Sequence, residues 1–177
     1  MLPTYTTDRL ILRSIKIEDL EDHLAMDLDP EVVKYIRPTP PPDEHRVFLK
    51  NRFAMQFAAG LGFWSVFEKG HQPGIGAFVG WALLVPLALE GPEVEIGYRF
   101  VQRAWGKGYA TQAARVKRDH GFEKTGLEEI CAVTHPDNSA SQHVLQKIGL
   151  TRQQNRFAYG QSLPYFTLTK STWRSGQ

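Results

Sequence analysis

Apolar residues in the first half of the chain follow two different spacings. Leu20, Leu24 and Leu28 recur at intervals of four with acidic residues between them, and this spacing predicts an amphipathic helix. Asp29 followed by Pro30 can cap and open a further helical turn. Runs rich in β-branched and aromatic residues predict strands instead. The elements expected in this half also include strands at 10–13, 63–67, 77–85 and 93–101, and a second helix capped by Asp43.

The second half of the chain continues to alternate strands with helices. A glycine turn follows residue 101, and Ala110, Ala113 and Ala114 then lie at helical spacing in a run that reaches Phe122. The remaining expected elements are a buried strand at 129–134, a helix with Val144, Leu145 and Ile148 on one face, and two strands at 150–157 and 165–170. This order predicts an α/β fold with a mixed sheet.

Composition and charge are those of an ordinary globular protein. The 177 residues are 42% hydrophobic and 23% charged, and the net charge of +2 favours neither nucleic acid nor a membrane surface. Cys131 is the one cysteine, which excludes an internal disulfide and suits a reducing compartment. No apolar run approaches the ~20 residues of a membrane span, and the six histidines show no metal-ligand spacing. We expect a single cytoplasmic domain over residues 1–177, with no metal, nucleic-acid or membrane partner.

A glycine-rich turn joins the strand at 93–101 to the long helix. The first amides of a helix lack internal partners and carry partial positive charge, so such a turn can hold phosphate. Gly106 and Gly108 let the backbone approach an anion, and Arg103 and Lys107 add full charges. A dinucleotide fingerprint would need glycine at Thr111, and a P-loop would need Ser or Thr at Gly108. The pattern predicts a diphosphate site of another kind, with a plain strand-to-helix turn as the alternative.

A resemblance to a known family is carried by the segment Arg103-Ala104-Trp105-Gly106-Lys107-Gly108. It resembles the Gln/Arg-x-x-Gly-x-Gly/Ala motif of the GNAT superfamily of N-acetyltransferases. Together with Glu95-Ile96-Gly97-Tyr98 before it and Tyr109-Ala110-Thr111 after it, the segment is similar to the RimJ/RimL-like branch, which acetylates protein N-termini and small amines. The resemblance covers nearly the whole chain. It implies the GNAT (acyl-CoA N-acyltransferase) fold, an α/β fold with a mixed, mostly antiparallel sheet of about seven strands flanked by helices.

The resemblance also implies that the protein binds acetyl-CoA along one continuous stretch. The backbone at Phe100, Val101 and Gln102 would pair with the pantetheine arm, and a local bulge there would free an amide to polarise the thioester carbonyl. The turn and the start of the helix would hold the diphosphate and the adenosine. The residues implied for that role are Arg103, Gly106, Lys107, Gly108, Tyr109 and Ala110.

Three polar residues are candidates for the chemistry and for holding the sulfur. By the resemblance, Asn138 would hydrogen-bond the pantetheine arm, and Ser141 would lie beside the sulfur and help to protonate it. The alternative is helix capping, by Asn138 itself or by Ser139 with Gln142. The resemblance makes Glu95 the base that takes the amine proton, directly or through water. The alternative for Glu95 is a solvated or cross-strand-paired acid at a strand end.

The chemistry follows from what amide formation needs. The amine must lose a proton, because an ammonium with a pKa of ~8 to ~10 has no lone pair. The resemblance implies an acetyl-CoA-dependent N-acetyltransferase that acts on a primary amine, either a protein N-terminal amine or a small-molecule amine, by direct transfer in a ternary complex. The alternative is a non-catalytic acyl-CoA-binding regulatory module. The sequence leaves the acceptor and the formation of a homodimer open.

The long helix departs from the family pattern in its second half. Lys117 lies four residues after Ala113, on the stripe that should be buried. Gly121 lowers helix stability by up to ~1 kcal/mol relative to alanine. We therefore expect either a displaced helix or a lysine stem that carries its charge out to solvent.

Overall fold

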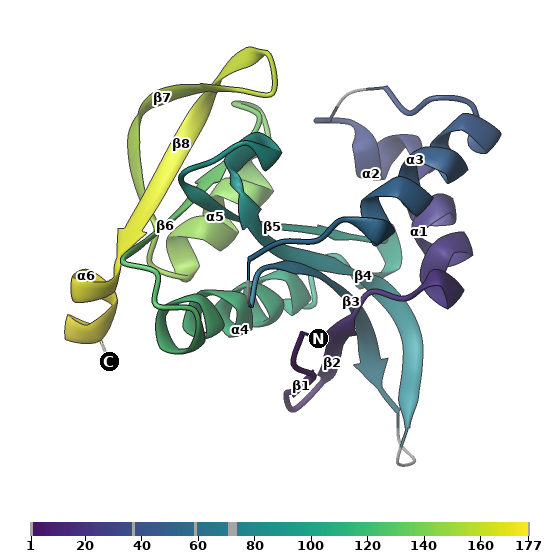
Figure 1. The fold of residues 1–177 in the computed structure, drawn as a ribbon, viewed down its shortest axis with the longest axis horizontal. Helices are drawn as coiled ribbons and strands as arrows, with labels where there is room; N and C mark the ends of the chain where they lie inside the picture. Colours follow the sequence, from purple (N-terminus) through teal and green to yellow (C-terminus); the bar gives the residue numbers. More distant parts are fainter. Residues whose placement is uncertain (1, 37, 59, 71–73, 177) are drawn as a thin grey trace.

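All the strands that the structure describes belong to one sheet. The computed structural model describes residues 2–36, 38–58, 60–70 and 74–176. The strand order is β1-β2-β3-β4-β5-β6-β8-β7, and every neighbouring pair is antiparallel except β5 and β6 (Figure 1). The strands are β1 Tyr5–Thr6, β2 Leu10–Ser14, β3 Gly62–Lys69, β4 Ile75–Pro86, β5 Val94–Phe100, β6 Glu129–Val133, β7 Thr151–Ala158 and β8 Gln161–Thr169. The predicted mixed, mostly antiparallel sheet is confirmed, with β1 as an additional strand.

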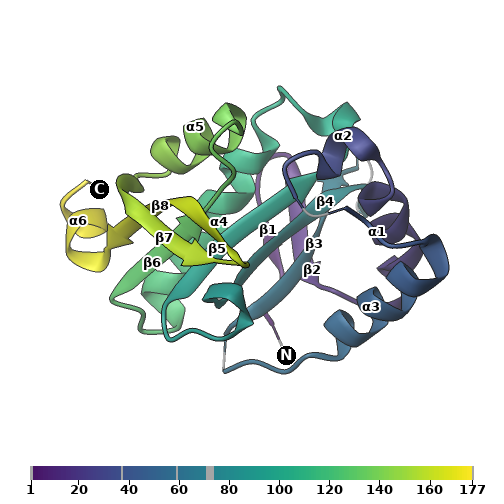
Figure 2. The ribbon, with the colours of Figure 1, turned by 90° about the horizontal axis from the view of Figure 1, so that it is seen from above.

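Helices cover both faces of the sheet. The group α1–α3 lies on one face, while α4 and α5 lie on the other (Figures 1 and 2). The helices are α1 Leu20–Asp27, α2 Pro30–Val33, α3 Pro42–Ala54, α4 Tyr109–Lys124, α5 Ser139–Lys147 and α6 Lys170–Ser175. This alternation of strand and helix along the chain is the order that the sequence predicted, apart from the short α6.

Two of the predicted helix starts can be compared with the structure. Asp29 caps α2 as expected, because its Oδ1 accepts a hydrogen bond of 3.0 Å from the amide of Glu31. The cap predicted at Asp43 is wrong: α3 begins one residue earlier at Pro42, and Pro41 is its N-cap. Proline is favoured in a first turn because its missing N–H would have no partner there. Asp43 instead lies in the first turn, where its charge suits the helix dipole.

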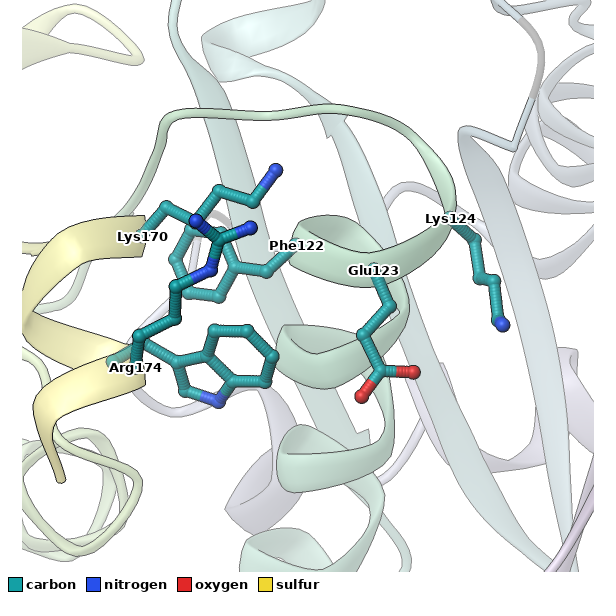
Figure 3. Close-up of a pocket in the computed structure, with 6 residues that line it drawn as sticks. Phe122, Glu123, Lys124, Lys170 and Arg174 are labelled. Atoms are coloured by element: carbon teal, nitrogen blue, oxygen red, sulfur yellow. The ribbon is translucent and has the colours of Figure 1, made fainter. Parts of the chain in front are cut away.

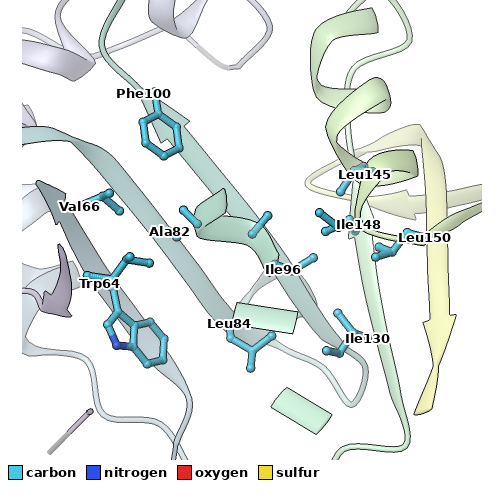
Figure 4. Packing of buried hydrophobic residues seen from close by; sticks show 14 of the residues in the cluster. Trp64, Val66, Ala82, Leu84, Ile96, Phe100, Ile130, Leu145, Ile148 and Leu150 are labelled. Atoms are coloured by element: carbon cyan, nitrogen blue, oxygen red, sulfur yellow. The ribbon is translucent and has the colours of Figure 1, made fainter. Parts of the chain in front are cut away.

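The main core lies between the sheet and α4 and α5. Side chains from β3, β4, β5 and β6 meet Leu145 of α5 and Ile148 at its C-cap there, as Figure 4 shows. Alternate residues of a strand point to opposite faces. Ile96 and Phe100 therefore belong to this core, while Glu95 and Arg99 of the same strand face α1–α3. A single strand, β5, thus supplies side chains to both sides of the sheet.

The buried face of α4 contains a lysine. Lys117 is fully buried, and its Nζ lies 3.3 Å from the ring centre of Trp64 and 4.4 Å from that of Tyr5. The expectation that its stem would carry the charge to solvent is wrong. Burial lowers the pKa of Lys117 to about 6. Near neutral pH the amine is therefore mainly uncharged, and among the described residues its Nζ has no hydrogen-bond partner. The aromatic faces would attract the ammonium form at lower pH.

The sheet divides between β5 and β6. These two parallel strands share one register pair, Glu95 with Cys131. On its other side β5 pairs with β4 in unbroken register from Pro86–Val94 to Gly80–Phe100. The bulge expected at residues 100–102 stays a prediction, because this register ends at Phe100. Beyond Glu95, the edge of β5 that faces β6 has no register partner in the described sheet.

The last two strands form a tight hairpin. Tyr159 and Gly160 connect β7 to β8, and both have positive φ values of 53° and 78°. Two-residue turns of this hand match the twist of the flanking strands. The sequence predicted a longer loop up to residue 164, so the start of β8 at Gln161 is a correction. The short turn determines where Tyr159 lies, and this matters for the site.

Candidate active site

The turn between β5 and α4 has the backbone that an anion site requires. Gly106 and Gly108 adopt positive φ values of 72° and 77°, which glycine tolerates without a Cβ penalty. Gln112 donates the first helical hydrogen bond, 3.1 Å to the carbonyl of Gly108. The amides of residues 109–111 therefore precede that bond, and the first turn of α4 contains no acidic residue. Such a helix start attracts an anion.

Cationic side chains surround this turn, although not all in the predicted way. Arg9 donates a 2.7 Å hydrogen bond to the carbonyl of Lys107, and its guanidinium lies 5.1 Å from the ring centre of Tyr109. Lys107 reaches Glu68 at 3.7 Å and is half exposed. Arg103 turns inward and donates to the carbonyl of Phe78. The sequence analysis did not assign Arg9 to the site, because it lies 98 residues away from Lys107 along the chain.

The end of β5 is fixed by contacts within the protein. The amide of Val101 donates to the carbonyl of Val79 at 3.0 Å, and Trp105 Nε1 donates to the carbonyl of Phe100 at 2.8 Å. Gln102 holds both carboxylate oxygens of Asp29 at 2.9 Å. The turn is thus joined to the start of α2. Pairing of residues 100–102 with a pantetheine arm stays a prediction.

Glu95 is a buried carboxylic acid beside the division of the sheet. Its side chain is 5% exposed, and the hydroxyl of Tyr159 donates a hydrogen bond to its Oε1. Burial raises the pKa of Glu95 to about 7, and the hydrogen bonds from Tyr159 and the amide of Ala88 oppose this rise. The solvated acid that was the alternative is therefore excluded by its burial. The sequence offered Tyr159 only as a weak candidate to contact the acceptor or act as an acid, and its contact with Glu95, 64 residues away along the chain, was not predicted.

Ser141 and Asn138 occupy the start of α5, on the other face of the sheet. Asn138 caps this helix, because its Oδ1 accepts a 3.1 Å hydrogen bond from the amide of Ser141. Tyr98 of β5 places its hydroxyl 3.0 Å from the carbonyl of Ser141 and 3.2 Å from its Oγ. From the sequence, Tyr98 could contact the acceptor or act as an acid, but an aromatic residue in a strand is more often part of the core. The structure brings Ser141 to β5 through this tyrosine.

The candidate groups thus lie on both faces of one strand. Glu95 and Tyr98 are three residues apart, a separation of roughly 10 Å along β5. Because three is an odd number, their side chains point to opposite faces. Glu95 faces α1–α3, and Tyr98 faces α5 with Ser141. An acid–base group and a hydroxyl pair therefore flank the edge of β5 where β6 separates from it.

A surface hollow lies away from these groups. Its volume is about 540 Å³, and its lining residues are Phe122, Glu123, Lys124, Lys170, Trp173 and Arg174, shown in Figure 3. These residues belong to the last turn of α4 and to α6. Since α4 has 16 residues, its two ends are about 24 Å apart. This hollow is therefore separate from the glycine turn at the other end of α4.

Two further findings limit the kinds of site that the described residues can form. None of the helices in the described ranges is both long and apolar enough to cross a membrane. In the same ranges, no group of three or more His, Cys, Asp or Glu side chains is placed to hold a metal ion.

Comparison with known proteins identifies the family. The sequence profile of the Acetyltransferase (GNAT) domain matches residues 9–151. The chain belongs to the GNAT acetyltransferase family. It is an acyltransferase that uses acetyl-CoA, and its mixed sheet with flanking helices is the GNAT fold. The donors at the start of α4 and the cations around the glycine turn suit the diphosphate of that cosubstrate.

Relatives of this GNAT protein include enzymes and solved structures. The FsC-acetyl coenzyme A-N(2)-transacetylase of Aspergillus fumigatus is 33% identical over 165 residues, which cover 88% of this chain and 68% of the relative. An acetyltransferase structure from Agrobacterium tumefaciens has 25% identity and a TM-score of 0.78, with 95% of each chain covered. The spermidine N-acetyltransferase of Vibrio cholerae, solved with CoA and spermine, has 16% identity and a TM-score of 0.74 over 95% of this chain and 99% of that one. At that identity the last match shows the fold alone.

Proposed function

We propose that this GNAT protein is an N-acetyltransferase of the RimJ/RimL-like type that acetylates a primary amine by direct transfer in a ternary complex. One observation carries the proposal: a buried carboxylic acid with a pKa of about 7 lies beside the edge where β5 and β6 part. That edge leads, within the same strand, to the glycine turn. A proton acceptor and an anion site are thus linked by one rigid element. We further propose that residues 1–177 act as one domain, in the cytoplasm.

The glycine turn would hold the diphosphate. The amides of residues 109–111, Lys107 and Arg9 supply donors and positive charge, while Gly106 and Gly108 allow the turn itself. Tyr109 and Ala110, in the first turn of α4, would line the space for the rest of the nucleotide. The inward contact of Arg103 with Phe78 gives it a role in shaping the turn.

The two faces of β5 would divide the proton transfers between them. Acetyl-CoA supplies the acetyl group as a thioester, with the CoA thiol as the leaving group. Glu95 takes a proton from the acceptor's ammonium, directly or through water, and its pKa of about 7 suits that task near neutral pH. Ser141 relays to the departing sulfur the second proton that the nitrogen loses as the amide forms, and Tyr98 orients the Ser141 hydroxyl. Asn138 would hydrogen-bond the pantetheine arm through the part of its amide that does not cap α5.

The acceptor is either a protein N-terminal amine or an amine on a small molecule. The transacetylase from Aspergillus fumigatus is named for acetyl transfer to an N(2) position, which supports an amine as the acceptor here. A sequence identity of 33% supports the amine class of the acceptor and does not specify which amine it is.

The deciding experiment is release of free CoA thiol from acetyl-CoA with a panel of peptides and small amines. We expect amine-dependent thiol release together with an acetylated product seen by mass spectrometry. A non-catalytic acyl-CoA-binding module would show thermal stabilisation by CoA with no thiol release at any amine concentration. That outcome would contradict the proposed function.

A further inference from the structure

A small pocket lies on the same face of β5 as Glu95. It is formed by α1, α2, α3 and the proline-rich segment between α2 and α3, and Arg99 reaches it from β5. Glu95 and Arg99 are four residues apart, roughly 13 Å along the strand. Gly97 lies between them and presents no side chain to this face. The side chain of Leu83 on β4 packs over Gly97, so the pocket and the proposed base lie on the same face of β5 with this leucine between them.

The only acid among the described residues that line this pocket is already engaged. Asp27 is buried, and its Oδ2 accepts a 2.9 Å hydrogen bond from His45 Nε2. Its Oδ1 accepts from Arg99. Burial acts to raise the pKa of Asp27, but the charge of Arg99 and the hydrogen bond from His45 lower it further than burial raises it. Asp27 is therefore ionised, and each of its oxygens already accepts a hydrogen bond, so it is a poor partner for an added ammonium.

The balance of charge in the pocket is positive. Arg52 and Arg99 contribute two guanidinium groups against the one carboxylate of Asp27 among the described lining residues, which leaves a net charge of +1. Arg52 lies 4.6 Å from the ring centre of Phe48. Burial is the main reason that the pKa of Tyr159 is raised, and the charge of Arg52 opposes it. The positive charge of Arg52 therefore acts on Tyr159, the residue that hydrogen-bonds Glu95.

Two buried donors beside the pocket need an acceptor atom. Among the residues that the structure describes, neither Arg99 Nε nor Trp81 Nε1 has a hydrogen-bond partner. Trp81 and Arg99 face each other in the β4–β5 register, with the guanidinium 5.2 Å from the centre of the indole. Leaving a buried donor unsatisfied lowers stability by about 1–3 kcal/mol. A ligand with oxygen atoms could accept hydrogen bonds from these two donors, which have no acceptor among the described residues.

We propose that this pocket binds a carboxylate of the acceptor, so that the enzyme acetylates amines that also carry an acid. The inference rests on the proposed function and narrows its substrate to amino-acid-like or peptide-like molecules. A guanidinium matches a planar carboxylate through paired N–H donors. The amine of the acceptor lies at Glu95 while its acid lies at Arg99 and Arg52. Polyamines, which add positive charge to a positive pocket, are poor substrates.

The test compares acids with their matched amides. Linear ω-amino acids of increasing length, their primary amides and spermidine are assayed by thiol release at saturating acetyl-CoA. We expect kcat/KM for the best acid to exceed that of its amide by roughly tenfold, the size of one charge-assisted contact. Arg52→Gln should bring this ratio close to one. Arg46→Gln is the matched control, because Arg46 lies on the same helix but binds Glu21 and Asp43 at the surface.

A second variant protects the test against loss of folding. Arg99→Gln would leave the buried Asp27 without its cation and could unfold the protein. Arg99→Lys is therefore used, because it keeps the positive charge but lacks the paired N–H donors of the guanidinium. It should lower the ratio of acid to amide, while the melting temperature stays within a few degrees of the wild type. An unchanged ratio in both Arg52→Gln and Arg99→Lys would overturn the inference.

The outcomes separate this inference from the proposed function. If amides react as well as acids, the pocket does not select a carboxylate, and the proposed function still stands. If no amine releases thiol, the proposed function fails, and calorimetry of the same acids and amides on the CoA-saturated protein then decides the inference. Acid-selective binding that Arg52→Gln abolishes supports it. Equal or absent binding overturns it.

Discussion

The residue with the most specific environment is Glu95. A carboxylic acid placed against the sheet and bonded to Tyr159 loses most of its hydration, and this loss favours the protonated form. The resulting pKa of about 7 means that both forms are populated near neutral pH. A general base is most useful when its pKa is close to the working pH. The same burial excludes the role of an ordinary surface acid.

Replacing Glu95 tests whether it is the base. In the wild type, kcat/KM should rise with pH up to about 7, because only the ionised carboxylate accepts a proton. Glu95→Gln should remove this rise and lower kcat by on the order of 10²–10⁴. Glu93→Gln is the control, since Glu93 lies two residues away and pairs with Arg156 near the surface. A pH profile that is the same in Glu95→Gln as in the wild type would exclude Glu95.

Ser141 can be tested separately from its helix. Ser141→Ala removes the hydroxyl, but the carbonyl that accepts from Tyr98 and the amide that Asn138 caps both remain. We therefore expect a turnover rate lowered by at least about tenfold, with little change in the dissociation constant of acetyl-CoA measured by calorimetry. Ser139→Ala, an exposed residue of the same first turn, is the comparison. If both variants turn over at the wild-type rate, Ser141 has no part in the proton transfer.

At the scale of elements, the turn from β5 to α4 depends on its backbone conformation. Gly108 has a φ of 77°, and an L-residue loses about 1–2 kcal/mol in that left-handed region. Gly108→Ala should therefore distort the start of α4 and weaken acetyl-CoA binding by roughly tenfold, the equivalent of about 1.4 kcal/mol. Gly74→Ala is the control, because a Cβ there has nothing within 4 Å. Equal affinities for the two variants would show that the turn does not bind the diphosphate.

Helix α4 contains the second element-scale prediction. Lys117 has a folded pKa of about 6 against 10.5 for the unfolded chain. The unfolded state therefore binds more protons between these values, so the free energy of unfolding rises with pH, by up to about 1.4 kcal/mol per pH unit. Lys117→Met should flatten this rise and raise the melting temperature at pH 7. Lys124→Met, in the exposed last turn of the same helix, should change neither. A lower melting temperature for Lys117→Met would show that the aromatic contacts outweigh the burial.

Sequence periodicity predicts the long elements well and the short ones poorly. The strands of the central sheet and helices α4 and α5 were expected close to their observed bounds, because each has several turns or alternations. Strand β1 has two residues and α6 has six, too few for a periodic signal. The position of Lys117 inside the core could not be predicted, since its aromatic partners Tyr5 and Trp64 come from distant strands.

At the scale of the whole molecule, the candidate site depends on contacts that are distant in sequence. The glycine turn and Ser141 were recognisable because the motif residues are close together in the chain. Arg9 was not recognisable as a site residue, and the contacts of Tyr98 and Tyr159 could not be predicted, because they form only through the order of strands in the sheet. The neighbouring strands β5 and β6 are separated in the sequence by 28 residues, from 101 to 128. The edge where they part therefore forms only when the two strands pair in the folded sheet.

The most direct test of this account is a crystal structure of the protein with CoA. We predict the pyrophosphate against the amides of residues 109–111, beside Lys107 and Arg9. We predict the thiol at the edge of β5 where β6 separates, between Glu95 on one face and Ser141 on the other. A pyrophosphate bound at the hollow between α4 and α6, or a thiol far from both of these side chains, would contradict it.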